Sequence, residues 1–353
     1  MNASETLISV VVPAYNATRT LARTLESALN QTHRAVEILV VDDGSTDGTA
    51  ELARGFAARD GRVRVITQAN AGVARARNSG IELARADYLA PLDADDLWHP
   101  TKLEKQLSVL NAAPPDTAFV YCAFRTIDEE DRVLGHSSVF RLRGRVFHRH
   151  ALVNFVGNGS ALLLRRTAVL ECGGYDPSLR DAGFEGTEDF LLQLRLASRY
   201  PVDVVPEYLV GYRRGAGAMS ERNEVMGRSF LAAIERAPNP SSEARRALDW
   251  AAGPFLATCA VRAAWRGQVQ SAASLLALGF GRDAFGAAVQ TASIAKARAV
   301  ERLRRAGAAA LAPKSSESRA RRFYDFDPTE SRVEGTDWFV ERRLAKMALL
   351  DAR

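Results

Sequence analysis

The stretch LISVVVPAYN, residues 7–16, decides the fold class. It is a short apolar run rich in β-branched residues that ends in a polar turn, as a buried strand of a parallel sheet does. Runs of the same kind recur through the first 125 residues, and the segments between them carry apolar residues at helical spacing. The predicted strands cover residues 7–12, 36–41, 63–66, 87–92 and 117–124. This alternation predicts an α/β fold, with a mostly parallel sheet flanked by helices.

The pattern becomes weaker in the middle of the chain. Residues 128–154 are polar and rich in Arg and His, which suggests a second small sheet or a wall of the active site. Apolar runs predict short strands over residues 160–164 and 201–209, and helical spacing predicts a helix over residues 187–198. The loop that follows, residues 213–220, contains two glycines and is predicted to be mobile.

The composition changes after residue 224, where Ala, Arg and Leu recur with helical periodicity between prolines. We therefore predict a first domain over residues 1–224 and a helical C-terminal extension over residues 225–353, with a linker over residues 314–322. The net charge of the chain is +5, but the extension holds 21 Lys and Arg against 13 Asp and Glu. This excess of positive charge suggests a polyanionic neighbour, either a membrane surface or a nucleic acid.

The end of the chain contains an apolar stripe at spacings that can share one helix face, with cations around it. Its apolar members are Trp338, Phe339, Leu344, Met347 and Leu350, and the cations are Arg342, Arg343, Lys346 and Arg353. Such a stripe suits peripheral binding to an anionic membrane. Packing of the same stripe against the first domain or a second subunit explains it equally well.

Composition excludes several classes of protein. In a chain of 353 residues, 47% are hydrophobic and 25% are charged, which excludes a disordered chain and allows one or two real cores. The three cysteines lie far apart without a CxxC pair, so we expect no zinc knuckle and no disulfide framework, and a reducing compartment.

The same sequence shows no clear targeting signal. The first ten residues lack the basic start and long apolar segment of a signal peptide, so the protein is expected to begin at Met1. The longest candidate for a membrane span, residues 271–280, is bounded by Arg266 and Arg282, and we expect no integral membrane protein. A cytoplasmic protein is predicted, with peripheral association at the cytoplasmic face of the inner membrane.

Polar side chains follow the predicted strands at their carboxyl ends, where open α/β sheets bind ligands. Tyr15 and Asn16 follow the first strand, and Asp42 and Asp43 follow the second. One carboxylate here, Asp42 or Asp47, is expected to be a helix N-cap, while Asp43 is expected to face a nucleotide. Neither GxxxxGK[ST] nor GxGxxG occurs at these turns, which excludes a P-loop NTPase and an NAD-type Rossmann site.

A second acidic motif, Asp93-Ala94-Asp95-Asp96, follows the fourth predicted strand. Carboxylates two residues apart in an extended segment can turn toward one cation, and their hard oxygen atoms suit Mg²⁺ or Mn²⁺. In contrast, His148 and His150 lack a third ligand, so we expect a solvated basic stretch there rather than a metal site.

Taken together, these motifs resemble the signature of glycosyltransferase family 2. The motifs are VPAYN at 12–16, VDDGSTD at 41–47, NAG at 70–72 with ARN at 76–78, and LDADD at 92–96. The resemblance covers residues 7–215 and implies a GT-A fold. It also implies that Pro13, Tyr15, Asn16 and Asp43 hold the nucleoside of a nucleotide-sugar and that Arg77 lies near the nucleotide or its phosphates. Asp93 and Asp95 would form the metal-binding DxD element, with Asp95 in direct contact with Mn²⁺ or Mg²⁺.

Motifs later in the chain extend the resemblance. They are GNGS at 157–160, GGYD at 173–176 and the pair Glu188-Asp189. By resemblance, Asn158, Gly174 and Glu188 lie on the sugar or acceptor side, and Asp189 is the catalytic base. No Gln-x-x-Arg-Trp follows Asp189, which makes the chain unlike processive synthases. The segment Tyr212-Arg213-Arg214 is similar to a family element whose loop could close over the diphosphate.

The resemblance implies a metal-dependent, inverting glycosyltransferase. A nucleoside-diphosphate sugar, with UDP favoured, would be the donor, and a glycan or lipid-linked molecule would be the acceptor; no nucleic-acid partner is expected. Two alternatives remain. One is a nucleotide-sugar-binding protein without turnover, and the other is a sugar nucleotidyltransferase, although the Gly-rich phosphate loop of that class is absent.

Overall fold

A computed structural model of the chain describes residues 6–215, 222–238, 241–311, 321–330 and 338–352, with side chains for all of these except residues 299–311, 338 and 339. Most of the loop predicted to be mobile and most of the predicted linker lie outside these residues, as do the side chains of Trp338 and Phe339. The description that follows concerns the described residues.

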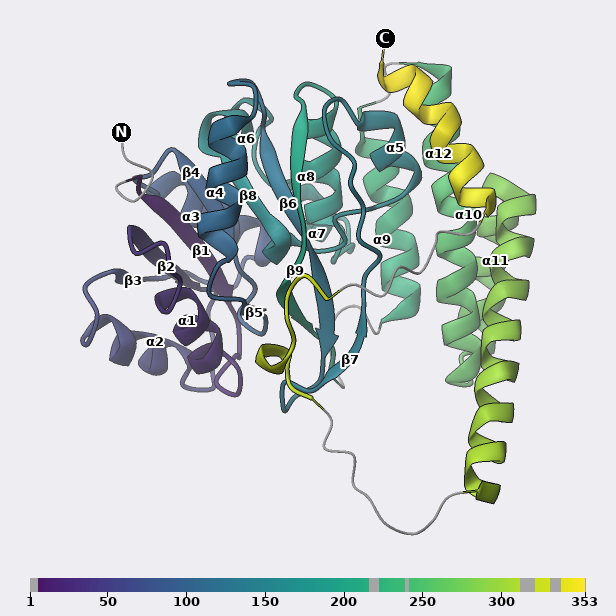
Figure 1. Ribbon diagram of the computed structural model, residues 1–353, viewed down its shortest axis with the longest axis horizontal. Helices are drawn as coiled ribbons and strands as arrows, with labels where there is room; N and C mark the ends of the chain where they lie inside the picture. Colours follow the sequence, from purple (N-terminus) through teal and green to yellow (C-terminus); the bar gives the residue numbers. More distant parts are fainter. Residues whose placement is uncertain (1–5, 216–221, 239–240, 312–320, 331–337, 353) are drawn as a thin grey trace.

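One mixed sheet forms the centre of the molecule, and helices cover its faces (Figure 1). Its strand order is β3-β2-β1-β4-β8-β6-β9-β5, with β7 paired to β6. The strands are β1 (Ile8–Ala14), β2 (Val36–Asp42), β3 (Val63–Thr67), β4 (Tyr88–Pro91), β5 (Leu97–Trp98), β6 (Phe119–Ile127), β7 (Val133–His136), β8 (Leu162–Arg165) and β9 (Val202–Arg213). The predicted α/β class is confirmed.

The first four strands are parallel to one another, and the later part of the sheet contains both parallel and antiparallel pairs. Strands β1, β2, β3 and β4 pair in parallel, whereas β8 pairs antiparallel with both β4 and β6. All seven residues of β1 and of β2 are buried, which is why each reads as a nearly continuous apolar run. Strands β7 and β8 join this same sheet, so the prediction of a second small sheet over the middle segment is wrong for the described residues.

The helices of the first two thirds of the chain pack on this sheet. They are α1 (Leu21–Leu29), α2 (Thr49–Ala57), α3 (Val73–Leu83), α4 (Lys102–Ala112), α5 (Phe147–Leu152), α6 (Arg166–Glu171), α7 (Ser178–Asp181) and α8 (Glu188–Ala197), with the 3₁₀ turn η2 (Gly159–Ala161). A polar loop precedes each of the helices α3 and α8, and the first turns of both helices border the candidate site.

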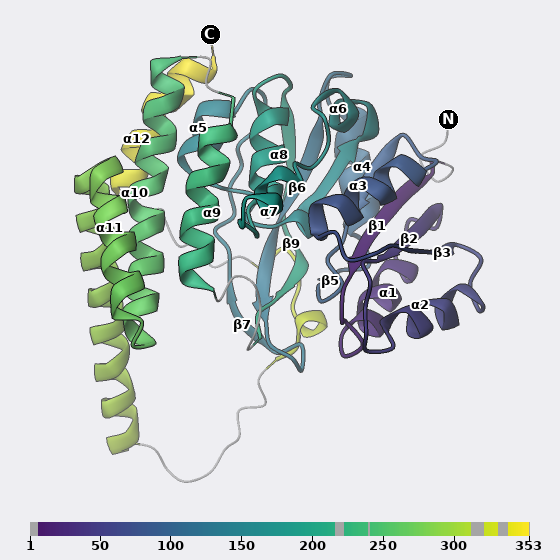
Figure 2. The ribbon, with the colours of Figure 1, turned by 180° about the vertical axis from the view of Figure 1, so that it is seen from behind.

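The C-terminal extension is helical, as predicted, and lies at one side of the sheet (Figures 1 and 2). Its helices are α9 (Asn223–Arg236), α10 (Ser242–Trp265), α11 (Val269–Leu311) and α12 (Trp338–Asp351). The backbone of α11 is non-helical at Asp283 (φ −152°, ψ 87°), where the helix bends. The Asp283 carboxylate forms an ion pair with Arg343 of α12 at 2.7 Å. Both side chains are largely buried, and the pair holds the bend against α12.

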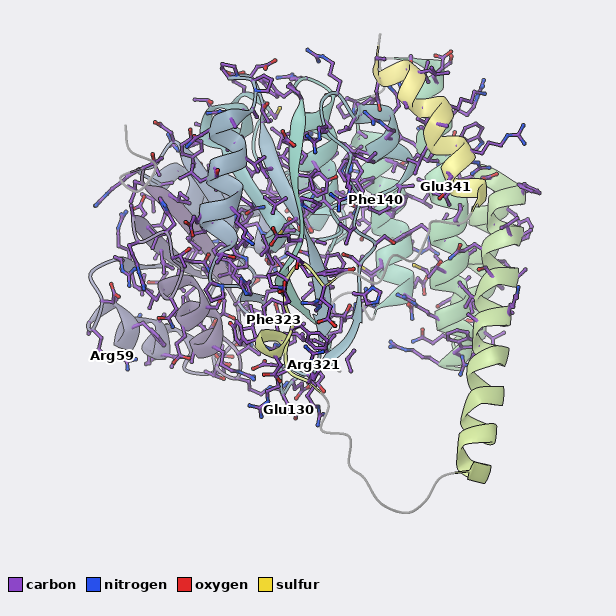
Figure 3. All side chains as sticks on the ribbon, viewed as in Figure 1. Arg59, Glu130, Phe140, Arg321, Phe323 and Glu341 are labelled. Carbon is purple, nitrogen blue, oxygen red and sulfur yellow. The ribbon has the colours of Figure 1, made fainter. Side chains whose placement is uncertain are left out.

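Residues 321–330 return from the extension to the sheet (Figure 3). The 3₁₀ turn η4 (Phe323–Asp325) buries Phe323 against Leu97 and Ile127. Backbone hydrogen bonds join Val133 N–H to the Arg321 carbonyl at 3.1 Å and Tyr208 N–H to the Pro328 carbonyl at 2.8 Å. Residues 321–330 therefore take part in the core of the first domain. A domain boundary at residue 224 remains a prediction from the sequence.

The final helix packs inward through the apolar stripe found in the sequence. Met347 is buried, and Leu344 and Leu350 pack half-buried against the main core. Asp351 accepts hydrogen bonds from the backbone N–H of His148 at 2.8 Å and from Arg149 Nε at 2.6 Å. These contacts with α5 favour intramolecular packing, one of the two alternatives that the sequence left open.

One segment of α11 meets the length and composition of a membrane-crossing helix. It is Val269–Arg298, with a mean hydropathy of 1.2 over an 18-residue window of which 22% is buried. Arg282 and Asp283 interrupt the apolar run of this helix, as expected from the sequence, although the helix itself continues through them. The bend at Asp283 and its ion pair with Arg343 lie within this segment, and both are compatible with a helix that packs on the surface of a folded domain.

Candidate functional site

A cavity of about 1070 Å³ lies between the carboxyl ends of the central strands and the C-terminal helices. One end is lined by the loops after β1, β2 and β4, and the other by α8, α9 and α10. Of the residues predicted for the site, Pro13, Tyr15, Asn16, Asp43, Arg77, Asp93, Asp95, Asn158, Glu188 and Asp189 all line this one cavity, whereas Gly174 is absent from its lining.

The turn after β1 presents its side chains to the cavity at the first end. Pro13 is buried, and Tyr15 is 54% exposed. Asn16 has a positive φ of 49°, and its side chain accepts a hydrogen bond from Thr46 N–H at 2.8 Å. Asn16 thus ties the turn after β1 to the turn after β2, and Tyr15 is left with an accessible ring at the cavity wall.

Asp43, at the end of β2, is buried and organises the next loop. Its carboxylate accepts hydrogen bonds from Gln68 Nε2 at 2.8 Å, Ala71 N–H at 2.8 Å and Gly72 N–H at 2.7 Å. An ionised carboxylate has about four acceptor positions, so roughly one remains for a ligand. The carboxylate of Asp43 therefore keeps about one free acceptor position.

The predicted helix cap near Asp43 is corrected by the structure. The N-cap of α2 is Gly48, which has a φ of 82° and makes no side-chain capping bond. Asp47, one position earlier, accepts from Thr49 N–H at 3.1 Å and from Thr18 Oγ1 at 2.8 Å, and Asp42 accepts from Ser45 N–H at 3.3 Å. The positive φ at the cap position suits glycine better than Asp, which explains why Gly48 occupies it. The carboxylates of Asp42 and Asp47 instead accept hydrogen bonds from nearby turns.

Arg77 joins two carboxylates that are distant in the sequence. Its guanidinium contacts Asp93 Oδ1 at 2.6 Å and Asp189 Oδ1 at 2.7 Å, and it lies 5.0 Å from the ring centre of Tyr175. Burial alone would lower the pKa of Arg77, but the charges of Asp189 and Asp93 raise it well above its usual value. Arg77 is therefore a fixed cation that orients both carboxylates, and its exposure as an ordinary surface residue is excluded.

Asp189 lies in the first turn of α8 with its carboxylate toward the cavity. Burial is the main cause that raises the pKa of Asp189 to about 7, and the charges of Asp93 and Glu188 add to it against the opposing effect of Arg77. A carboxylate with a pKa near neutrality suits general-base chemistry. The neighbouring Glu188 turns back to accept the Gly186 N–H at 2.9 Å, so its carboxylate is engaged by its own loop.

The acidic motif after β4 divides into one structural and two cavity-facing carboxylates. Asp96 is fully buried and accepts from Ser160 Oγ at 2.6 Å and Arg213 N–H at 2.9 Å. Asp93 and Asp95 face the cavity. Burial, followed by the charge of Asp93, raises the pKa of Asp95 to about 6, despite the lowering effect of Arg213.

These two carboxylates fit a divalent cation that arrives with a nucleotide. No cluster of three or more His, Cys, Asp or Glu that could hold a metal by itself occurs in the part of the chain that the structure describes. Mg²⁺ and similar ions need no such cluster, because they keep waters and bind through one or two carboxylates together with substrate phosphates. Burial is the main cause of the raised pKa of Asp95, and the charge of Asp93 adds to it; a cation beside the two carboxylates would oppose the effect of Asp93.

Three further predicted residues have different surroundings. Asn158 is buried at the cavity wall just before η2, and no described residue hydrogen-bonds to its amide. Gly174, with a φ of 66°, lies behind the wall, where an added Cβ would come 2.8 Å from Asn78 Oδ1. His150 is fully buried in α5, and burial lowers its pKa to about 3, so the expected solvated basic stretch is wrong at this position.

Sequence reasoning missed the cavity residues that come from the extension. Met226 and Phe230 of α9, Phe255 and Arg262 of α10 and Arg343 of α12 all line it. Arg214, after β9, faces the same space, and Arg262 has its pKa lowered first by burial and second by the charge of Arg214. No local motif marks these helices, and their basic and aromatic composition was the only available signal.

Comparison with known sequences finds a family match and several relatives for the first half of the chain. Residues 9–172 match the family described as glycosyl transferase family 2. Over 130 residues the chain is 38% identical to chondroitin synthase of Escherichia coli, which covers 37% of this chain and 19% of that protein. Over 105 residues it is 43% identical to the putative teichuronic acid biosynthesis glycosyltransferase TuaG of Bacillus subtilis, covering 30% of this chain and 42% of that protein. The chain spans less than half the length of both relatives.

Solved structures are similar over most of the chain. S. aureus TarS has a TM-score of 0.55 at 14% identity, covering 83% of this chain and 92% of that one, and a further structure of it contains UDP-GlcNAc. The mannosyltransferase PcManGT from Pyrobaculum calidifontis, in complex with GDP-Man and Mn²⁺, has a TM-score of 0.50 at 21% identity, covering 80% of this chain and 86% of that one. At these identities the likeness shows the fold, and it extends into the C-terminal helices.

Proposed function

The chain belongs to glycosyltransferase family 2 and has the GT-A fold, and from this premise we propose that it transfers a sugar from a nucleoside-diphosphate sugar to an acceptor hydroxyl with inversion. The proposed acceptor is a glycan or a lipid-linked molecule. One observation carries the proposal. A carboxylate with a pKa near 7, Asp189, shares a cavity with the DxD carboxylates and with the nucleoside-side residues of the family motifs.

Asp189 is proposed as the general base. It would accept the proton of the acceptor hydroxyl as that oxygen attacks the anomeric carbon of the donor in line, and the nucleoside diphosphate leaves from the opposite face. A single displacement of this kind inverts the anomeric configuration. Arg77 supports the step by holding the Asp189 carboxylate at 2.7 Å, which fixes its direction before the substrate arrives.

The donor would lie at the end of the cavity near β1 and β2. Tyr15 offers its exposed ring to the nucleobase, Asp43 has one acceptor position left, and Asn16 and Pro13 shape the turn between them. UDP is the favoured nucleotide. Structural neighbours that bind UDP, UDP-GlcNAc or GDP-Man support a nucleotide-sugar partner of this general class.

Mn²⁺ or Mg²⁺ is the proposed cofactor, held by Asp95 with Asp93 beside it. When bound, such an ion stabilises the negative charge that develops on the leaving diphosphate. Arg213 cannot easily take that role, because its guanidinium is buried and donates to the Asp95 carbonyl at 2.7 Å. Arg214 and Arg262 line the cavity instead, and we propose them as additional positive charge for the diphosphate.

Two alternative functions, nucleotide-sugar binding without turnover and nucleotidyl transfer, can be distinguished from glycosyl transfer by their substrates and products. A binding protein without turnover would bind the nucleotide-sugar and not cleave it, and a nucleotidyltransferase would consume a sugar phosphate and a nucleoside triphosphate. The cavity keeps Asp43, Asp93, Asp95 and Asp189 together, which supports the transferase over the inactive protein.

The test is a thermal-shift screen of UDP, GDP and their sugar conjugates, with Mn²⁺ or with EDTA, followed by measurement of nucleotide release. A ligand that binds only the native state raises the melting temperature by mass action. We expect a shift with UDP-sugars that depends on Mn²⁺, and slow release of UDP by transfer to water. Absence of any shift would contradict the proposed function, and a shift without release would favour the inactive protein.

We also propose that the protein is cytoplasmic and associates with the inner membrane at its surface. The argument rests on the excess of cations in residues 225–353 and on exposed apolar side chains of α11. Val269, Phe280 and Phe285 are 71%, 43% and 58% exposed. An apolar face with cations near it suits the headgroup region of an anionic bilayer.

A further inference from the structure

The cavity continues past Asp189 into a region where the motifs of the sequence supply Asn158, from GNGS, but not the residues of the later helices. There its wall comes from α8, the loop before η2 and the helices of the extension. Three buried amide side chains line this region: Asn158, Gln193 and Asn223, which are 5%, 1% and 3% exposed. They come from three separate elements, so their meeting at one wall is a property of the fold and not of a local turn.

The amides are short of hydrogen-bond partners. Among the described residues, none hydrogen-bonds to either side-chain polar atom of Asn158 or to Asn223 Nδ2. Gln193 lies against the neutral ring of His150, and neither of its amide atoms makes a hydrogen bond of good geometry there. Buried polar groups are nearly always paired, because leaving them unpaired costs free energy. A ligand that both donates and accepts hydrogen bonds would satisfy these three amides.

The same amides surround the proposed base. Gln193 follows Asp189 by four residues on α8 and therefore lies on the same helix face, about 6 Å further along the axis. The backbone of Gly159, next to Asn158, passes so close that an added Cβ would come 2.9 Å from Asp189 Oδ2. A molecule held by Asn158 and Gln193 would thus place one of its groups at the Asp189 carboxylate.

Aromatic rings complete this part of the wall. Phe190, Phe230 and Phe255 form a continuous stack, with ring centres 5.2 Å and 4.3 Å apart and interplanar angles of 10° and 21°. Phe230 and Phe255 line the cavity together with Phe190. Sugar rings present C–H faces that pack on aromatic surfaces and hydroxyls that each donate one hydrogen bond and accept others. Amides beside aromatic rings match both features of a sugar ring.

We propose that Asn158, Gln193 and Asn223 form the subsite for the acceptor, and that the acceptor presents a sugar ring there. This inference rests on the proposed glycosyl transfer and names the substrate class of that site. Asn223 is the first residue of α9, so the C-terminal extension supplies part of the acceptor subsite. The donor's own sugar shares this chemistry, and the experiment below separates the two.

The test compares acceptor use in the full chain and in two variants, Asn223→Ala and Gln193→Leu. The probes are p-nitrophenyl glycosides of common hexoses, added to a UDP-sugar that the protein cleaves slowly in water. We expect at least one glycoside to raise UDP release above this hydrolysis. Each variant should raise the KM of that glycoside by about ten-fold or more, while the Kd of the donor changes less than about two-fold.

Asn111→Ala is the matched control, because Asn111 is an exposed amide outside the cavity lining. Melting temperatures check folding, and Asn223→Ala remains informative if Gln193→Leu disturbs the contact with His150. If no glycoside stimulates release, or if the variants leave its KM unchanged, the acceptor subsite is overturned. A loss in donor affinity that equals the loss in acceptor KM would assign the amides to the donor sugar instead. Failure of the donor to bind at all would instead contradict the glycosyl-transfer proposal.

Discussion

The two ends of the cavity differ in how fully their polar side chains are used by the protein itself. At the strand end, Asp43 accepts three hydrogen bonds and Arg77 pairs with two carboxylates. At the helical end, both amide atoms of Gln193 and Nδ2 of Asn223 have no well-formed partner among the described residues. The first end is a rigid, preorganised frame, and the second is a set of groups that awaits a ligand.

This difference explains why the sequence predicts one end of the cavity and, apart from Asn158 in GNGS, not the other. Groups that hold loops together must keep their type and spacing, and such sets form motifs like VDDGSTD and LDADD. Two of the proposed acceptor residues, Gln193 and Asn223, come from separate helices, and the types of such residues follow the ligand rather than the fold. Reading the chemistry of the helical end therefore requires the structure.

The largest effect that tests the strand end is expected from Asp95→Asn. Because this change removes one charge from a loop and no core volume, the fold should persist while transfer is abolished, even at saturating Mn²⁺. Rates of UDP release and circular dichroism measure the two effects, and EDTA should inhibit the parent protein. Asp116→Asn, at an exposed loop carboxylate, serves as the control. Turnover of Asp95→Asn within a few-fold of the parent would remove the metal role from Asp95.

The next effect, smaller but still large, concerns Asp189 where the two ends meet. Asp189→Asn should retain donor binding and lose roughly 10² to 10⁴ in rate, the usual contribution of a general base. Donor titration by calorimetry and single-turnover rates separate these quantities. Glu188→Gln is the matched comparison, because that carboxylate is engaged by Gly186 N–H. A larger rate loss in Glu188→Gln than in Asp189→Asn would move the base to Glu188.

The pH profile gives the same prediction an independent measure. The base acts when it is ionised, and burial raises the pKa of Asp189 to about 7. Below that pH, kcat/KM should therefore fall by about ten-fold per pH unit, because this parameter reports ionisation in the free enzyme. Asp189→Asn should flatten this acid limb, whereas a limb that persists unchanged would have to come from another group, such as Asp95.

The fold of the first half was predictable because it follows from local patterns. The predicted strands over residues 7–12, 36–41 and 63–66 match β1, β2 and β3 within two residues at either end, and buried parallel strands explain their continuous apolar character. The carboxyl ends of parallel strands meet at one edge, so the meeting of Asp43 with the acidic motif after β4 could also be anticipated.

The features that were missed depend on contacts between distant segments. The antiparallel insertion of β8 beside β4, and the return of residues 321–330 to β7 and β9, are set by long-range packing that local periodicity does not contain. His150 was misjudged for a related reason. Residues 147–152 form α5 rather than a strand, and the extension covers that helix through Asp351.

The smallest expected effect tests whether the outer side of the helical end contacts a membrane. The described members of the α12 stripe pack inward, so the candidates are now exposed residues: Leu349 on α12, which is 70% exposed, and Phe280 with Phe285 on α11. We expect the full chain to float with anionic vesicles and less with neutral ones, because each cation near the headgroups contributes about 1 kcal/mol. Phe280→Ser combined with Phe285→Ser should reduce this recovery several-fold, and Leu349→Ser should do so if α12 also contributes.

Leu134→Ser is the matched control, because Leu134 is an equally exposed leucine, at 63%, on β7 of the first domain. Truncation before residue 321 is unsuitable here, since it would remove Phe323 from its buried contact with Leu97 and Ile127. Equal recovery of all variants, or equal recovery with neutral and anionic vesicles, would contradict a contact between these exposed helix faces and an anionic bilayer.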